Sequence, residues 1–234
     1  MPVLEELEPR TATLMDALRR FGMPGGKQNL RHVRGVKLTQ RGEMRSSPDA
    51  AWMPFSAEEV LEAGRSEFRW RARFGAGRVR WIEVTDGYEQ RRGSLVVRLA
   101  GLVPVARSIG PDVDRGELQR YLAEIVWCPP AILQHPSLEW WARDARTLRL
   151  RDREGPPEAT VDVELAEDGV PVAVRGVRPR LVGKHTIDTP WAGTYYEPRE
   201  WEGLRVPGRV EVRWLLAEGP FTYFKGEVTS LVLL

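Results

Sequence analysis

The segment Glu67-Phe-Arg-Trp-Arg-Ala-Arg-Phe74 alternates polar and apolar side chains without interruption. Its polar positions carry one glutamate and three arginines, and its apolar positions carry Phe68, Trp70, Ala72 and Phe74. A period of two residues is typical of a β-strand that buries one face and exposes the other. This stretch therefore predicts a sheet that covers an apolar interior with an aromatic-rich face.

The same alternation recurs along most of the chain. The segment Val161-Asp-Val-Glu-Leu165 leads into Asp168-Gly169, a dipeptide typical of a hairpin turn. Further turns are expected at Gly75-Ala-Gly77, at Asp86-Gly87 and at Glu218-Gly-Pro220. Strands are predicted over residues 33–44, 67–74, 78–85, 95–99, 145–151, 159–166, 170–178, 210–217 and 221–233.

Helical periodicity is expected in three places. Residues 11–21 form a short helix, and a second helix is predicted from Ser56, where Glu59 completes a capping box. The third helix begins at Asp114 and ends before Pro129. Its apolar stripe recurs at helical spacing through Leu118, Tyr121, Leu122, Ile125 and Val126.

These elements predict a mainly β protein of the α+β class, in which an antiparallel sheet curves into an incomplete β-barrel wrapped on one or two helices. Residues 1–24 are expected to form an N-terminal helical arm, and residues 25–234 a single β-rich half-barrel domain. Residues 183–209 show no clear period and are rich in proline and aromatic side chains. Long loops of that kind are often lids or binding elements.

Composition narrows the class of protein. The chain of 234 residues is 42% apolar and carries a net charge of +2, too small to indicate nucleic acid or an acidic membrane as a partner. Cys128 is the single cysteine, which excludes an intrachain disulfide and predicts a small buried side chain. The sequence shows neither an export signal nor a transmembrane segment, so a cytoplasmic location is expected unless a leader has been trimmed.

Several blocks carry a resemblance to known proteins. They include Gln40-Arg-Gly-Glu-Met44, Glu117-Leu-Gln-Arg-Tyr-Leu-Ala-Glu124 and Trp127-Cys-Pro-Pro130. Over residues 33–230 the chain resembles an uncharacterised bacterial family of unknown function. More distantly, its layout is similar to the half-barrel of lipoprotein-localisation carriers (LolA/LolB-like), in which a sheet curves around helices and shelters an acyl chain. The chain departs from those carriers because it shows no export signal and no lipid-anchor cysteine near its start. The resemblance therefore implies the fold but does not imply lipoprotein transport.

The predicted inward faces carry an unusually aromatic set of side chains. Such a set can fill the core of a barrel, which is the favoured interpretation, or it can line a cavity for an apolar ligand. A cavity would bind a lipid-like small molecule and would need no cofactor or metal. The candidate ligand-binding residues are Trp70, Trp81, Arg120, Tyr121, Glu124, Trp127, Trp191, Trp214 and Tyr223.

Arg120 and Glu124 are spaced four residues apart on the third predicted helix, with Glu117 nearby. The favoured interpretation is a salt-bridged row on the protein surface. Alternatively, the row faces the mouth of the sheet, where burial shifts the pKa of Glu124 and suits it to acid–base chemistry. An enzyme of that kind would use Arg120, Glu124 and Asp144 as its polar groups.

No motif for a known chemistry stands out, and no catalytic residue is assigned. His32, His135 and His185 lack the spacing of metal ligands, and neither a serine elbow nor a phosphate-binding loop occurs. A stacking surface for nucleic acid needs arginines and aromatic rings on one face. Here the aromatic residues alternate with the arginines, so we predict a solvated outer face and no nucleic-acid partner from Arg69, Arg71, Arg73, Arg78 and Arg80.

Three functions are compatible with these patterns, in decreasing order of preference. The first is non-catalytic binding of an apolar or amphipathic small molecule inside the half-barrel. The second is an enzyme of unknown reaction that uses Glu124 and Arg120 in the same cavity. The third is a protein–protein interaction module that docks a partner through an edge strand or the N-terminal arm.

Overall fold

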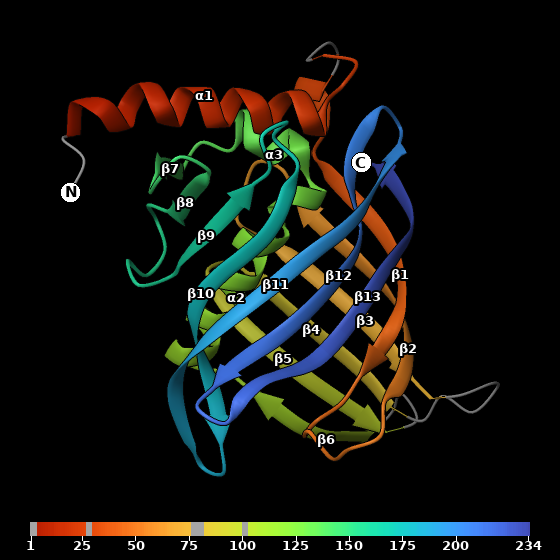
Figure 1. Cartoon of the computed structure of the whole chain (residues 1–234). Helices are drawn as coiled ribbons and strands as arrows, with labels where there is room; N and C mark the ends of the chain where they lie inside the picture. The colour runs from red at the N-terminus through yellow and green to blue at the C-terminus, as the bar shows by residue number, and fades with distance from the viewer. Residues whose placement is uncertain (1–3, 27–29, 76–81, 100–102) are drawn as a thin grey trace.

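The computed structural model describes residues 4–26, 30–75, 82–99 and 103–234 (Figure 1). The helices are α1 (Leu4–Gly22), α2 (Pro111–Glu124) and α3 (Pro129–Gln134), with 3₁₀ turns at Leu30–His32 and Ile125–Trp127. The strands are β1 (Gly35–Met44), β2 (Met53–Glu62), β3 (Phe68–Phe74), β4 (Ile82–Glu89), β5 (Arg92–Leu99), β6 (Val103–Ser108), β7 (Leu138–Ala142), β8 (Thr147–Asp152), β9 (Thr160–Leu165), β10 (Pro171–Val182), β11 (His185–Trp201), β12 (Leu204–Leu216) and β13 (Gly219–Leu233).

The strands of the described residues pair in one antiparallel sheet. Its order is β6-β5-β4-β3-β2-β1-β13-β12-β11-β10-β9-β8-β7. Among the residues that the structure describes, β6 and β7 form the two ends of this order and do not pair with each other, so the sheet is open. Figure 1 shows the sheet curving around α2, with α1 lying across one end. The prediction of a mainly β half-barrel wrapped on helices is confirmed.

Alternating burial holds where the sequence pattern is cleanest. The four apolar side chains of β3 are buried and the arginines between them are exposed. The hairpin between β9 and β10 is also confirmed, and Gly169 at its tip has a φ angle of 85°. A Cβ atom on Gly169 would lie 2.4 Å from the backbone of Ala17 in α1. Glycine therefore allows both the turn and the close approach of the helix.

The helix predicted from Ser56 is wrong, because residues 53–62 form strand β2 between β1 and β3. The buried positions of this strand are Phe55, Ala57, Glu59 and Leu61. The carboxyl group of Glu59 interrupts the apolar alternation, and together with Ser56 it imitates a capping box. Pairing with a strand on each side overrides that local signal.

The turn predicted at Asp86-Gly87 is also wrong, because this dipeptide lies within β4. Asp86 is opposite Trp70 of β3, so its carboxylate is on the inner face of the sheet. Strand β4 is described over Ile82–Glu89, and the first four residues of the strand predicted over 78–85 lie outside the described part of the chain. The predicted turn after Gly75 falls mainly on residues outside the described part of the chain.

Residues 183–209, expected to be irregular, contain all of β11 and the first six residues of β12. Gly193 occupies a buried position between Trp191 and Tyr195, and the missing side chain hides the alternation of this strand. Prolines also suggest breaks in the pattern, yet Pro198 lies directly opposite Pro207 in the β11–β12 pair. Long paired strands therefore replace the expected loop.

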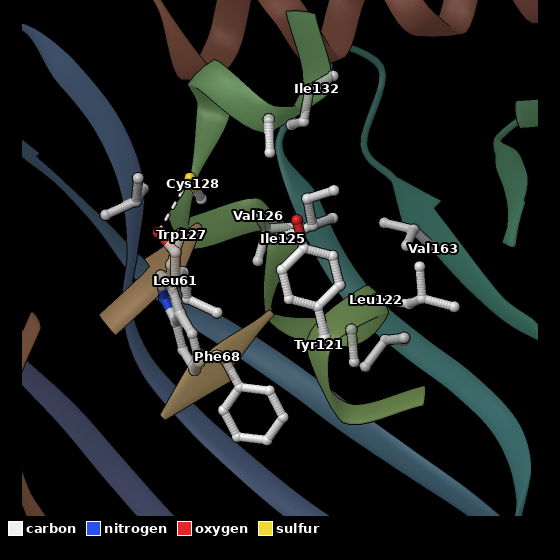
Figure 2. Close-up of a cluster of buried hydrophobic side chains, with 14 of the residues drawn as sticks. Leu61, Phe68, Tyr121, Leu122, Ile125, Val126, Trp127, Cys128, Ile132 and Val163 are labelled. Carbon is white, nitrogen blue, oxygen red and sulfur yellow. Dashed lines mark hydrogen bonds between the residues drawn. The ribbon is translucent and has the colours of Figure 1, made fainter. Parts of the chain in front are cut away.

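One face of α2 fills the core of the half-barrel. Leu118, Tyr121 and Leu122 have no exposed surface. Figure 2 shows Tyr121 and Leu122 gathered with Phe68 of β3 and Val163 of β9. Burying a leucine or phenylalanine side chain contributes about 1.5–3 kcal/mol relative to leaving it exposed. The stripe read from the sequence therefore stabilises the contact between helix and sheet.

Helix α2 begins at Pro111, three residues before the predicted start. Proline suits the first helical turn because its missing N–H has no partner there. The Asp114 carboxylate, expected to cap the helix, instead accepts hydrogen bonds from the Gly93 N–H at 2.7 Å and from Arg92 at 3.0 Å. Asp114 therefore ties α2 to strand β5.

Cys128 follows the second 3₁₀ turn and is fully buried. In Figure 2 its sulfur points toward the Leu61 carbonyl, 4.0 Å away. Burial raises the pKa of the thiol to about 12, so the group stays neutral near pH 7. The prediction of a small buried side chain is confirmed.

Helix α1 packs against α3, β7, β8 and β12 at one end of the half-barrel (Figure 1). Leu14, Leu18 and Phe21 are buried on its inner side, and the Ala142 N–H of β7 donates to Thr11 Oγ1 at 2.8 Å. Among the residues described, no helix is both long and apolar enough to span a membrane. The division into residues 1–24 and 25–234 stays a prediction.

Candidate functional site

The concave side of the sheet contains a cavity of about 530 Å³, a size that suits a small molecule. Side chains of α2 form part of its wall, and inner faces of the sheet form the remainder. Met44, Leu181 and Phe221 line the cavity close to the β1–β2, β10–β11 and β12–β13 turns. Figure 1 shows these turns at the end of the half-barrel opposite α1.

Most of the predicted ligand-binding residues line this cavity. They are Trp70, Arg120, Glu124, Trp127, Trp191, Trp214 and Tyr223. Tyr121 belongs to the packed core instead, and its hydroxyl donates to the Glu62 carbonyl at 2.9 Å. Trp81 lies outside the described residues. Whether the lining residues bind a ligand stays a prediction.

Hydrogen bonds and ring contacts hold the aromatic wall in place. Trp191 Nε1 donates to Tyr223 Oη at 3.0 Å, and the rings of Trp214 and Tyr223 stack with centroids 5.7 Å apart. Tyr195 donates to the Ala123 carbonyl of α2 at 2.7 Å. Because these polar atoms find partners within the protein, the rings can offer apolar surface to the cavity.

A second part of the wall is charged and centres on Arg120. Its Nη1 lies 2.5 Å from Asp86 Oδ2, its Nε 2.9 Å from Glu124 Oε1 and its Nη2 3.3 Å from Glu59 Oε1. The Arg120 side chain is 15% exposed, and that of Glu59 is fully buried. The interpretation of Arg120 and Glu124 as a surface row is therefore wrong, and the alternative in which they face the sheet is observed.

Sheet register explains how distant acids meet at one place. Trp70 of β3 lies opposite Glu59 of β2 on one side and opposite Asp86 of β4 on the other. The Arg120 guanidinium lies over this row, 4.9 Å from the centre of the Trp70 ring. Gln40 of β1 accepts a hydrogen bond from Trp70 Nε1 at 2.9 Å and donates one to Glu59 at 2.8 Å.

Glu117 and Arg178 extend the charged part of the cavity wall. Arg178 Nη2 donates to the Gly116 carbonyl at 2.6 Å and lies 4.0 Å from Glu117 Oε1. Its guanidinium also lies 5.0 Å from the centre of the Trp191 ring, which joins the charged part to the aromatic part. We refer to the following set as the charged cluster: Glu59, Asp86, Glu117, Arg120, Glu124 and Arg178.

Burial changes how these groups hold protons. Desolvation raises the pKa of Glu59 well above its usual value, and the charge of Glu124 raises it further. Desolvation likewise raises the pKa of Glu117, with a further contribution from Asp86. Burial alone would lower the pKa of Arg120, but the surrounding carboxylates raise it well above its usual value. The cluster thus combines a stable cation with two carboxyl groups that hold their protons more tightly than an exposed glutamate does.

The sequence prediction does not place Glu59 or Asp86 in the cavity, and it names Glu117 only as a neighbour of Arg120 and Glu124. Glu59 was assigned to a helix cap and Asp86 to a turn, although both are acids at inward positions of alternating strands. Their inward positions in the sequence pattern were the signal that could have identified them as site residues, because a carboxyl group on a buried face needs a partner. Asp144, proposed for an enzyme, lies apart from this cavity, and its carboxylate accepts a hydrogen bond from the Arg146 N–H at 2.9 Å.

The outer face of the sheet differs from this inner surface. Arg69 pairs with Glu89 at 2.8 Å and Arg73 with Glu83 at 3.6 Å, and both arginines are more than half exposed. Arg78 and Arg80 lie outside the described residues. Within the described ranges, no group of three or more histidine, cysteine or acidic residues has the geometry to hold a metal ion.

Fold and site define a class of protein: an open half-barrel that encloses an apolar cavity with buried charges on part of its wall. The chain belongs to DUF6544, a family of unknown function whose profile matches residues 10–226. This match confirms the resemblance to an uncharacterised family and extends it into α1. No curated protein matches the chain.

Solved structures share the fold at low sequence identity. A DUF1329 family protein from Desulfovibrio piger is 8% identical, with a TM-score of 0.53 over 96% of this chain and 93% of that one. A LolA superfamily protein from Nitrosomonas europaea is 10% identical, with a TM-score of 0.51 over the same shares. A domain described as an outer membrane lipoprotein-sorting protein, from Vibrio parahaemolyticus, is 7% identical, with a TM-score of 0.50 over 98% and 92%. The likeness to LolA-type folds is confirmed.

These neighbours correct the expected cytoplasmic location. That expectation depended on the lack of an export signal in the sequence. The matching folds include a LolA superfamily protein and a domain described as an outer membrane lipoprotein-sorting protein, so the fold does not indicate a cytoplasmic location. The sequence as given therefore supports no conclusion about location.

Proposed function

We propose that the protein binds an apolar or amphipathic, lipid-like small molecule in its half-barrel cavity and does not change it chemically. The observation that carries this proposal is a cavity of about 530 Å³ bordered mainly by aromatic and aliphatic side chains. If the tryptophans served core packing alone, they would interdigitate and leave no such space. Instead Trp127, Trp191 and Trp214 border open volume.

The structural neighbours support the same ligand class. One of them is described as a lipoprotein-sorting protein, and lipoproteins carry acyl chains. A cavity on the concave side of an open, curved sheet suits a long apolar molecule. Binding is favoured over catalysis because Arg120 is already engaged by three carboxyl groups and Asp144 lies elsewhere.

Two measurements test the proposal. Native mass spectrometry of the purified protein, compared with its denatured mass, is expected to show an adduct of lipid-like mass. Titration with the neutral dye N-phenyl-1-naphthylamine is expected to show saturable fluorescence enhancement at one site. A bare native mass together with no saturable dye binding would contradict the proposal.

Neighbouring valines of β5 provide a matched pair of variants for the dye titration. Val97 lines the cavity, whereas Val96 is on the opposite face of the strand. Val97→Trp should fill the cavity and weaken dye binding at least tenfold, and Val96→Trp should leave the affinity unchanged. Equal effects of the two substitutions would place the dye outside the cavity.

A second candidate function is docking of a partner at the edge strand β6. Val103 and Val105 of this strand are 59% and 58% exposed, and Ile109 beyond it is 62% exposed. An unpaired edge can add a strand from a partner. Sedimentation analysis of the wild type and of Val105→Lys tests this function. A self-associated wild type dispersed by the substitution supports it, and two identical monomers contradict docking of a second copy.

A further inference from the structure

The charged cluster has acceptor oxygens without partners. Asp86 Oδ1, Glu117 Oε2 and Glu124 Oε2 are buried and accept no hydrogen bond from a neighbouring donor while the carboxyl groups are ionised, although Glu117 can share a proton with Asp86 and Glu59 with Glu124. The Asp86 and Glu117 residues are only 6% and 9% exposed, yet all three side chains line the cavity. Leaving a buried carboxyl oxygen unpaired costs free energy, so these oxygens need a proton or a ligand that donates to them.

The donors nearby are already used. Arg120 directs its Nε, Nη1 and Nη2 to three different carboxyl groups. Arg178 Nη2 donates to the Gly116 carbonyl, and its buried Nε has no partner. The cluster holds four carboxyl groups against two guanidinium groups, so its charges balance only while two of the carboxyl groups keep their protons. A positively charged ligand group would balance the cluster in place of such a proton.

Aromatic rings also border the charged cluster. The guanidinium of Arg120 lies over Trp70 and that of Arg178 over Trp191, so ring faces near the cluster are oriented toward cations. Tyr223 links the aromatic part of the wall to the cluster through its hydrogen bond with Trp191. Aromatic faces beside carboxylates form a favourable environment for organic ammonium groups.

We propose that the molecule bound in the cavity is an amphiphile with an ammonium head group, seated against Asp86, Glu117 and Glu124 while its apolar tail lies along the aromatic wall. This inference rests on the proposed function, since it specifies the ligand of the same cavity. The net charge of the protein is +2, so general electrostatic attraction would favour an anion. A measured preference for a cationic ligand would therefore come from the charged cluster and not from the net charge of the protein.

When the cavity is empty, protons on the carboxyl groups offset the negative charge that a bound ammonium group would otherwise offset. Burial and the charge of Asp86 raise the pKa of Glu117, so this carboxyl group keeps its proton to a higher pH than an exposed glutamate does. A bound cation favours the ionised carboxylate, so binding releases a proton and the affinity rises with pH. The charged or titratable groups that face Glu117 in this cavity are Asp86 of β4, Arg120 and Glu124 of α2, Arg178 of β10 and Tyr223 of β13, with Glu59 of β2 behind Arg120.

The test compares twelve-carbon amphiphiles that differ only in their head groups. Dodecylammonium, dodecanol and dodecanoate are used below their micelle concentrations to displace N-phenyl-1-naphthylamine near pH 7. Charge-assisted hydrogen bonds predict at least about tenfold tighter binding of dodecylammonium than of the other two. Equal displacement by all three would overturn the head-group inference and leave the proposed function intact. Absence of dye binding would instead contradict the proposed function.

Two further measurements assign the preference to the cluster. Glu117→Gln is expected to reduce the preference for dodecylammonium over dodecanol to less than about threefold, because an amide cannot become an anion. Glu200→Gln on the exposed part of β11 is the matched control and should retain the full preference. With the wild type, affinity for dodecylammonium should rise as the pH increases from about 5 to about 8, a range over which this amphiphile keeps its charge and its N–H donors. An affinity that does not change over this range would overturn the inference.

Discussion

The two sides of helix α2 show how differently a buried surface can be built. On one side Leu118, Tyr121 and Leu122 fill the available space and have no exposed surface (Figure 2). On the other side Arg120 and Glu124 border a cavity. The packed side needs only matching volumes, whereas the cavity side needs a partner for every buried charge. The packed side therefore provides stability, and the cavity side keeps a space of defined chemistry open.

The largest expected effect comes from removing the central cation of the cavity side. Arg120→Met leaves Glu59, Asp86 and Glu124 without their shared partner, which predicts a loss of about 3–5 kcal/mol in the free energy of unfolding near pH 7. Urea denaturation measures this loss. Arg69→Met breaks an exposed pair on the outer face and should cost about 1 kcal/mol or less. Equal losses in the two variants would show that the cluster is not a coupled unit.

Alanine substitutions of two valines, one on the packed side and one on the cavity side, allow a direct comparison of the two. Val163 is fully buried in the core, whereas Val212 lines the cavity. Val163→Ala should cost about 2 kcal/mol, because the lost contacts leave a void, and Val212→Ala less than about 1 kcal/mol. Urea denaturation of both variants gives the comparison. Equal losses would indicate that the cavity closes in solution.

The Glu59→Gln variant tests the cavity side through the pH dependence of the free energy of unfolding. Because its pKa is raised in the folded state, the folded protein keeps a proton on Glu59 that the unfolded chain releases. The stability associated with Glu59 is therefore present at low pH and declines as pH rises above the usual value for glutamate. The stability of Glu59→Gln relative to the wild type should increase by about 1 kcal/mol between about pH 5 and pH 8.

The neighbouring residue provides the control for that pH dependence. Glu58 is on the outer face of the same strand, where its exposed carboxylate pairs with Lys37 at 3.1 Å. Unfolding free energies of Glu58→Gln and the wild type should differ by a constant amount over the same pH range. A constant difference for Glu59→Gln as well would contradict proton retention by Glu59.

The smallest effect is expected at Asp144, outside the cavity. The Arg146 N–H lowers the pKa of Asp144, so its stabilising effect is present near neutral pH and disappears as pH falls. Because this carboxylate is exposed, Asp144→Asn should change the free energy of unfolding by less than about 0.5 kcal/mol. Dye affinity should also stay within about twofold of the wild type. A larger drop in affinity would connect Asp144 to the binding site.

Local patterns predicted the strands whose inward residues are all apolar. β3 and β9 matched their alternation, and the stripe of α2 matched its packed side. The predictions failed where the inner face carries a polar group or no side chain, at Glu59, Asp86 and Gly193. Functional positions often break local rules in this way, because the cavity needs groups that a simple core would exclude.

The sequence by itself determined the curved antiparallel sheet, the amphipathic helix inside it and the inward tryptophans, because periods of 2 and 3.6 residues depend only on neighbouring positions. Only the tertiary structure decided that Arg120 meets Asp86, 34 residues away, and Glu59, 61 residues away. Strand register and the placement of α2 over the sheet set those contacts. Tertiary packing also decided that the aromatic rings border a cavity instead of filling it, because free volume depends on how whole elements fit together.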